Sequence, residues 1–232
     1  MRMPAIFFGH GSPMNAIETN NFTESWIDVV QKFPKPKAIL AISAHWETIG
    51  TCLTSNKIQR TIHDFGGFPR ELFEVEYNPE GSESLVKRVQ ELIPSAKADS
   101  SWGLDHGTWS ILKHIYPKSD VPTIQLSIDR KISPQEHYNL AKKLNILRDE
   151  GVLIIGSGNI VHNLREIIWS DNAKPHSWAL QFNEAIKSAI LSKDHEKSQQ
   201  QSSDKVNLFA DEYCNGSLSM TSVFINEKQS DL

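Results

Sequence analysis

Short apolar runs alternate with stretches of helical periodicity along most of the chain. Strands are predicted at Pro4–His10, Lys37–Trp46, Thr51–Thr54, Thr123–Ile128 and Gly151–Gly158. The alternation predicts βαβ units, because a parallel strand pair needs a connection long enough to hold a helix. The first two runs are therefore expected to be a parallel pair joined by a crossover helix.

The segments between these runs carry helix signals at both ends. Helices are predicted over Glu18–Phe33, Ser82–Ile93, the residues leading to about Tyr116, Ser133–Asp149 and Trp178–Leu191. Ser82 and Ser133 are expected to be N-caps, with Pro134 at the first helical position. The pattern predicts one α/β domain over residues 1–232, with a mostly parallel central sheet, flanking helices and active-site loops at the carboxyl ends of the strands.

Several segments lack a regular pattern. The loop Thr61–Pro69 and the stretch Trp102–Trp109 contain glycine and aromatic residues and are expected to be irregular, as loops that carry binding sites often are. Ser192–Asn207 is polar and of low complexity, Ser217–Ile225 is expected to be a closing strand, and Asn226–Leu232 a frayed tail.

Composition excludes some classes of partner. The net charge is −4 and the chain has no cluster of Lys and Arg, so nucleic acid is not an expected partner. No apolar run approaches the roughly 18–20 residues that cross a bilayer. The N-terminus lacks the pattern of a signal peptide. We therefore expect no membrane partner and a cytoplasmic location.

Histidine is the chemically informative residue type, with nine copies against two cysteines. Imidazole binds iron, zinc and copper, so a metal site here would use nitrogen and oxygen ligands. His10, His45 and His162 each follow an apolar run and a small-residue turn. One such histidine is more often structural, but ligands of an open parallel sheet bind beyond the carboxyl ends of its strands. Three histidines in that position are expected to converge on one crevice.

Two further histidines lie in the irregular segments, each beside an aspartate. His63 precedes Asp64, and His106 follows Asp105. A pocket for a flat aromatic molecule would use aromatic rings for stacking and histidine for proton transfer. The alternative is that each His-Asp pair only forms a turn. The remaining histidines are expected to have solvated or capping roles: His114, His137, His176 and His195.

Competing catalytic motifs are weak. Gly156–Asn159 (GSGN) follows a predicted strand but lacks the third glycine of a dinucleotide-binding turn. The chain contains neither a phosphate-binding GxxxxGK[ST] loop nor the GxSxG turn of a serine hydrolase.

Several motifs in order resemble a known family. FFGHGSPMN, SAHWET, TIHDFGGFP, WGLDHGTW, QLSID, GSGNIVHNLR and GSLSM are similar to those of the DODA-type class III extradiol ring-opening dioxygenases. The resemblance runs from residue 2 to about 195 and resumes near Asp211. It implies a metal-dependent enzyme that opens the ring of a small aromatic diol of the DOPA type with O₂, with Fe(II) for activity and Zn(II) often found bound.

The resemblance also implies roles for individual residues. His10 and His45 would bind the metal, and His162 would be the acid/base beside it, recorded as a ligand in some relatives. His106 would be a further catalytic residue of the pocket, and His63 with Asp64 would contact the substrate.

One family feature is missing. Family members carry a Pro-Thr-Pro-Glu-His motif, whose histidine completes the metal site, where this chain has the polar run Glu196–Asn207. Three explanations are open. The segment is naturally absent and the site is weakened or inactive, the segment was lost from this sequence, or another residue such as His162 completes the metal coordination. A weakened or inactive member that binds or regulates, and a zinc hydrolase, are therefore the alternative functions.

Overall fold

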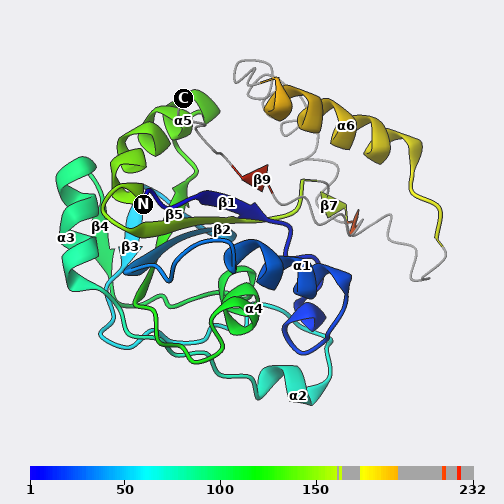
Figure 1. The fold of residues 1–232 in the computed structure, drawn as a ribbon, viewed down its shortest axis with the longest axis horizontal. Coiled ribbons are helices and arrows are strands. Elements are labelled where there is room, and N and C mark those ends of the chain that lie inside the picture. The colour runs from blue at the N-terminus through cyan, green and yellow to red at the C-terminus, as the bar shows by residue number, and fades with distance from the viewer. Residues whose placement is uncertain (161, 164–172, 193–215, 218–223, 226–232) are drawn as a thin grey trace.

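The computed structural model describes residues 1–160, 162–163, 173–192, 216–217 and 224–225. Within these residues, a seven-stranded sheet has helices on both faces (Figure 1). In spatial order its strands are β4 (Lys97–Asp99), β3 (Cys52–Thr54), β5 (Thr123–Asp129), β2 (Ala38–Thr48), β6 (Val152–Ser157), β1 (Ala5–Phe8) and β9 (Phe224–Ile225). The predicted α/β class with a mostly parallel sheet is confirmed.

The helices occupy the predicted connections. They are η1 (Pro13–Ala16), α1 (Asn21–Val30), α2 (Arg70–Phe73), α3 (Glu83–Leu92), α4 (His106–Ile115), α5 (Pro134–Leu144), η2 (Asn145–Arg148) and α6 (Ser177–Leu191). The N-cap predictions are confirmed, since the hydroxyl groups of Ser82 and Ser133 accept backbone N–H groups of the first turns of α3 and α5. Pro134 stands at the first position of α5.

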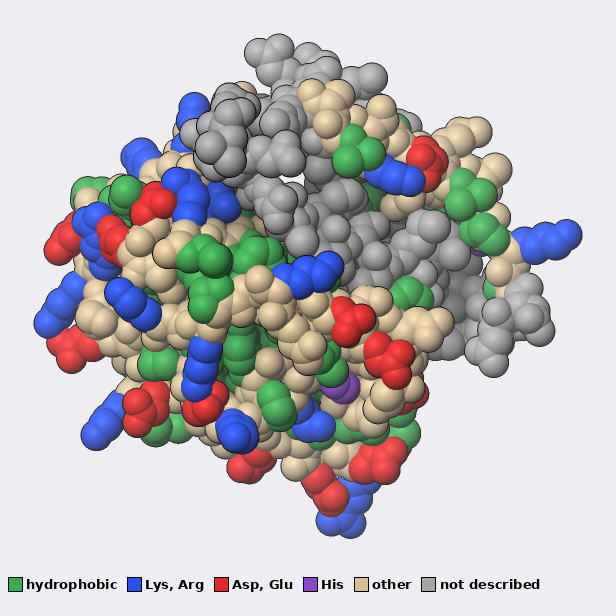
Figure 2. Space-filling model, viewed as in Figure 1, with side chains coloured by type: hydrophobic (Ala, Val, Ile, Leu, Met, Phe, Trp, Pro, Cys, Tyr) green, Lys and Arg blue, Asp and Glu red, His purple; other side chains and the backbone are tan. Residues whose placement is uncertain are grey.

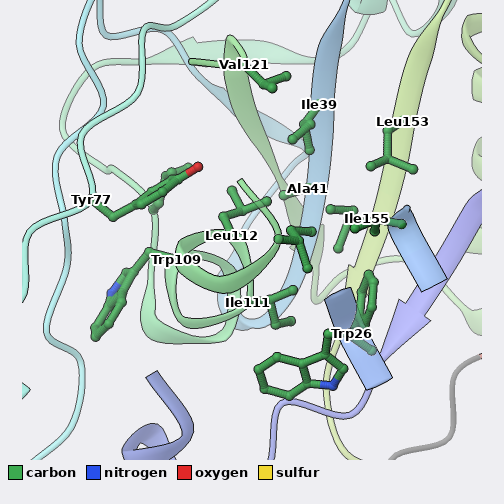
Figure 3. Close-up of a cluster of buried hydrophobic side chains, with 14 of the residues drawn as sticks. Trp26, Ile39, Ala41, Tyr77, Trp109, Ile111, Leu112, Val121, Leu153 and Ile155 are labelled. Atoms are coloured by element: carbon green, nitrogen blue, oxygen red, sulfur yellow. The ribbon is translucent and has the colours of Figure 1, made fainter. Parts of the chain in front are cut away.

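The core has two layers, one on each face of the sheet. Alternate residues of β2 divide between them, because successive strand side chains point to opposite faces. Ile39 and Ala41 pack with residues of α1 and α4, whereas Ala38 and Leu40 pack with residues of α3 and α5. Figure 3 shows the first layer, with Trp26 and Ile111 of the helices toward Ile155 of β6, and with Trp109 next to Tyr77.

Four parallel strands bring their carboxyl ends to one edge. β1 and β2 are each parallel to β6, and β2 is parallel to β5. The first two strands are parallel and connected through α1, as predicted, but they are not hydrogen-bonded to each other, because β6 lies between them. As a result, residues following β1, β2 and β6 meet at the same edge of the sheet.

Other differences concern the ends of elements. The predicted irregular stretch Trp102–Trp109 is wrong in its second half, because α4 begins at His106. The predicted helix Ser133–Asp149 ends as α5 at Leu144 and continues as the 3₁₀ turn η2. The closing strand was predicted as one strand. Instead β8 (Gly216–Ser217) pairs with β7 (His162–Asn163), while β9 pairs with β1. Residues 193–207 of the polar run, 218–223 between β8 and β9, and the tail lie outside the described residues.

Figure 2 shows acidic and basic side chains interspersed over the described part of one face. Among the described helices, none combines the length and the apolar character needed to cross a membrane.

Candidate metal centre

Three imidazoles converge at the carboxyl edge of the sheet. Nε2 of His10 lies 3.0 Å from Nε2 of His45. The ring of His106 lies 4.0 Å from that of His45 and 5.2 Å from that of His10, measured between centroids. One ring nitrogen from each residue lies within 4.8 Å of the other two. This arrangement is a candidate metal site, because imidazole nitrogen binds zinc and iron.

His10 is held by the turn that follows β1. Gly11 has φ +64°, a conformation that favours glycine, and a Cβ there would approach Asn15 Nδ2 to 2.9 Å. The same Asn15 Nδ2 donates to the His10 carbonyl at 2.9 Å. The turn thus fixes the main chain of His10 and buries its ring, which is 2% exposed.

His45 lies inside β2 rather than after it. The register of β2 against β5 shifts between Ile42 and Glu47, so the strand is irregular where His45 stands. Irregularities of this kind re-aim side chains next to functional sites. The side chain of His45 is 26% exposed and is the most accessible of the three imidazoles.

His106 is the first residue of α4, and a glycine allows it to come close to β2. A Cβ on Gly107 would lie 2.6 Å from Ser43 Oγ and 3.0 Å from His45 Cδ2. Any larger residue would push the start of α4 away from the strand. Within the sequence DHGTW, His106 supplies the imidazole and Gly107, which has no Cβ, allows the start of α4 to lie close to β2.

Oxygen atoms anchor the Nδ1 side of each imidazole. Nδ1 of His10 lies 2.9 Å from Ser157 Oγ, at the end of β6. Nδ1 of His106 lies 2.9 Å from Asp64 Oδ1, and Nδ1 of His45 lies 3.5 Å from Asp64 Oδ2. Such partners fix the tautomer and the orientation of metal-binding imidazoles.

Two carboxylates near His106, the half-buried Asp64 and the buried Asp105, have shifted pKa values. Burial alone would raise the pKa of Asp64, but hydrogen bonds and charge from His106, with a contribution from His45, bring it below its usual range. Burial raises the pKa of Asp105 to about 6, and the charge of Asp64 adds to the rise. Asp105 Oδ2 accepts from Gln125 Nε2 at 2.5 Å. The pKa values of the two carboxylates near His106 are thus shifted in opposite directions.

An aromatic wall adjoins the imidazoles. The ring of Phe65 meets that of His106 edge-on, with centroids 5.5 Å apart. Phe65 also contacts Phe68, Phe73 and the ring of His63, at 5.5, 5.0 and 5.8 Å. Phe73 is 39% exposed, so this wall reaches from the surface to the imidazoles. The arrangement suits contact with a flat apolar ring.

The structure gathers part of the predicted site. The predicted convergence of His10 and His45 is confirmed. His106 lies with them, although the sequence placed it in the substrate pocket. His63 lies one aromatic ring away, and its Nε2 is 3.0 Å from the Val75 carbonyl. The side chain of His162 lies outside the described residues, so its predicted convergence is untested.

Sequence reasoning missed Ser157 as a partner of His10. Its signal was the GSGN run after a predicted strand, which was considered only as a dinucleotide turn. Two other histidines, expected to have solvated or capping roles, instead contact main-chain carbonyls. Nε2 of His114 lies 2.6 Å from the Asn15 carbonyl, and Nε2 of His137 lies 3.0 Å from the Asp129 carbonyl. His176 stacks on Trp178, and His195 lies outside the described residues.

Comparisons with known proteins agree with the motifs. A family described as "Catalytic LigB subunit of aromatic ring-opening dioxygenase" matches residues 4–216. A 4,5-DOPA dioxygenase extradiol of Escherichia coli (strain K12) is 46% identical over 192 residues, which span 82% of this chain and 71% of that relative. One from Beta vulgaris is 40% identical over 202 residues, spanning 83% and 74%. The crystal structure of an uncharacterized E. coli K12 protein superposes with a TM-score of 0.70 at 40% identity, covering 82% of this chain and 73% of that one.

Proposed function

This chain belongs to the LigB family of aromatic ring-opening dioxygenases, and from that premise we propose that it opens the ring of a DOPA-type catechol with O₂. The observation that carries the proposal is the 3.0 Å approach of the Nε2 atoms of His10 and His45 beside an aromatic wall. The reaction needs a metal, so the first question is whether these residues fit one.

The hydrogen bonds around His10 assign its tautomer. The Ser157 hydroxyl donates to the Gly107 carbonyl at 2.5 Å, so its oxygen accepts from Nδ1–H of His10. A neutral His10 then has a lone pair on Nε2. A neutral His45 carries a proton on only one of its ring nitrogens. Its unprotonated nitrogen therefore points a lone pair at Nε2 of His10, if it is Nε2, or at the Asp64 carboxylate, if it is Nδ1. A cation between the two Nε2 atoms removes the conflict, because it accepts both lone pairs.

The spacing also suits a metal ion. Two nitrogens bound tetrahedrally at about 2.0–2.1 Å lie about 3.3 Å apart. The observed 3.0 Å between the Nε2 atoms of His10 and His45 is close to that separation. We expect Fe(II) in the active enzyme and Zn(II) as an ion that also binds. His10 and His45 would hold the ion, which would supply open coordination positions and redox activity for a reaction between a diol and O₂.

The surrounding residues would bind and orient the substrate. The Phe65 ring and the face of His63 offer apolar surface for the catechol ring, next to the imidazoles. Nε2 of His63 is occupied by the Val75 carbonyl, so we propose that His63 contacts substrate through its ring. Direct contact of Asp64 with substrate stays a prediction, since both its oxygens face imidazoles.

His162 is proposed as the acid/base, because an imidazole accepts and donates protons near neutral pH. It would accept a proton from the diol and return one as the ring opens. β7 begins at His162, one short connection after β6, which ends at the site. This position in the chain supports the role.

The test is oxygen uptake. Protein purified without oxygen is loaded with Fe(II), mixed with DOPA, and exposed to O₂ in an electrode cell while absorbance is followed. We expect stoichiometric uptake with a coloured semialdehyde product, and its loss in His10→Ala. Metal binding without uptake on DOPA or simpler catechols would contradict the proposal and favour a binding protein or a zinc hydrolase.

A further inference from the structure

We propose that His106 is the third metal ligand of this chain and that Asp64 is the residue that positions it, together with His45. This assignment rests on the proposed function, because it concerns the same metal site. It gives a ligand to a chain that lacks the family's Pro-Thr-Pro-Glu-His segment. It also gives Asp64 a role other than substrate contact.

The placement of His106 is suited to ligation. Its ring nitrogen lies within 4.8 Å of those of His10 and His45, and its side chain is only 6% exposed. Its ring centroid lies 4.0 Å from that of His45, closer than the 4.9 Å between His10 and His45. Since Nδ1 is engaged by Asp64, Nε2 is the nitrogen left for a metal. Three imidazoles on one side of an ion leave its other positions to substrate and O₂.

Asp64 contacts both neighbouring imidazoles with one carboxylate. Oδ1 accepts from the backbone N–H and from Nδ1 of His106, each at 2.9 Å. Oδ2 faces Nδ1 of His45 at 3.5 Å. A carboxylate on the far nitrogen orients a ligating imidazole and increases its basicity. One side chain therefore sets the orientation of two of the three rings.

Asp64 also accepts a hydrogen bond from the backbone N–H of His106, which fixes the main chain of that residue as well as its ring. Asp105 is the N-cap residue of α4, but its side chain makes no capping hydrogen bond. Asp64, from another loop, instead satisfies the N–H of His106 in the first turn. It also places a negative charge at the positive end of the helix. The loop that contains Phe65 is thereby connected to the element that supplies His106.

The decisive experiment replaces His106 by Cys and uses Co(II) as the probe. A thiolate bound to Co(II) gives an intense ligand-to-metal charge-transfer absorption, which a nearby but unbound thiol does not give. We expect this band in His106→Cys and not in wild type, which controls for the native cysteines. His63→Cys is the matched control, because His63 is a pocket histidine whose Nε2 faces the Val75 carbonyl and which is not one of the three clustered imidazoles. We expect no band from it.

Metal affinity tests the positioning role. Asp64→Asn keeps one oxygen for the His106 backbone N–H but replaces the other with a donor that opposes Nδ1–H of His45. We expect its Zn(II) affinity to fall about 10–100-fold, the usual cost of losing an outer partner. The melting temperature of the metal-free protein should change little. His106→Ala should lose more affinity than Asp64→Asn, and His162→Ala should keep the metal.

The outcomes separate the two proposals. If wild type binds no Fe(II), Zn(II) or Co(II), the proposed function itself fails. If wild type binds metal and His106→Cys binds Co(II) without the band, His106 is not a ligand and this inference is overturned. Unchanged Zn(II) affinity in Asp64→Asn, with a folded metal-free protein, would overturn the positioning role of Asp64.

Discussion

The two ends of helix α4 carry one histidine each, in contrasting environments. His106, at the first residue, has Nδ1 held by Asp64 and lies against two other imidazoles. His114, in the last turn, donates Nε2–H to the Asn15 carbonyl, and its ring packs against Trp26 at 5.8 Å. His106 is buried and His114 is half-buried. The difference is which nitrogen is used by the protein.

This contrast separates candidate ligands from structural histidines. A main-chain carbonyl on Nε2 uses the nitrogen that reaches furthest from the backbone, as in His114, His137 and His63. An acceptor on Nδ1 leaves Nε2 to face another partner, as in His10, whose Nε2 faces His45, and in His106. Within the residues the structure describes, the three clustered histidines each have an oxygen atom near Nδ1. They are His10, His45 and His106.

The largest effect on metal affinity is expected for His45→Ala. His45 belongs to β2 and lies beside His106 at the start of α4. The change removes one of the two nitrogens that lie 3.0 Å apart. Loss of a direct ligand should exceed the about 10–100-fold cost of losing an outer partner, so we expect Zn(II) affinity to fall by more than about 100-fold. Competition with a chromophoric chelator measures it. Affinity within about tenfold of wild type would show that His45 is not a ligand.

His114→Ala is expected to affect stability instead. It leaves the Asn15 carbonyl without this donor, which costs about 1–3 kcal/mol of unfolding free energy, and it removes the ring that packs on Trp26. Urea unfolding of the metal-free protein measures the loss. Zn(II) affinity should stay at the wild-type value. If Zn(II) affinity instead fell as much as in His106→Ala, the two ends of α4 would not be independent. The connection would be Asn15, which accepts from His114 and donates to the carbonyl of His10.

Ser157→Ala tests the anchor of His10, with a smaller effect. The hydroxyl accepts from His10 Nδ1 and donates to the Gly107 carbonyl, so it connects the end of β6 to the start of α4. We expect Zn(II) affinity to fall about tenfold, equivalent to about 1.4 kcal/mol. Ser157→Thr, which keeps the hydroxyl, is the matched control and should recover most of the affinity. Equal losses in both variants would indicate a steric effect rather than a lost hydrogen bond.

Much of the fold could be predicted from local patterns. Apolar runs and capping residues identified the main strands and helices, because these signals act within a few residues. Strand order could not be predicted in the same way. The insertion of β6 between β1 and β2 depends on packing between segments far apart in sequence. The short strand β4 and the single turn of α2 were missed because they have too few residues for a periodic pattern.

The site could be predicted in part for a similar reason. His10 follows a strand and a glycine turn, which is a local signal, and His45 ends an apolar run. The approach of His106 depends on the missing Cβ of Gly107 and on a carboxylate from a distant loop. Neither contact leaves a pattern in the surrounding sequence. The register shift in β2 that accompanies His45 is likewise set by pairing with β5.

The smallest effect concerns pH. Burial lowers the pKa of His114 below its usual 6.5 and the charge of Lys113 lowers it further, although the Asn15 carbonyl opposes the shift. The unfolded chain therefore binds a proton at this residue at a higher pH than the folded protein does. The contribution of neutral His114 to stability is complete above the ordinary pKa and decreases as the pH falls through and below 6.5.

His114→Gln removes this titration while keeping a side chain that can donate to the Asn15 carbonyl. Urea midpoints of the metal-free proteins are measured from about pH 5 to 8, the range in which histidine titrates. We expect the wild type to lose more stability than the variant as the pH is lowered, with the two curves converging in slope above the ordinary pKa. All other ionisable groups are the same in both proteins, so their contribution cancels in the difference. Parallel curves across the whole range would mean that His114 has the same pKa in the folded and unfolded states, so that the hydrogen bond to the Asn15 carbonyl fully offsets the effect of burial.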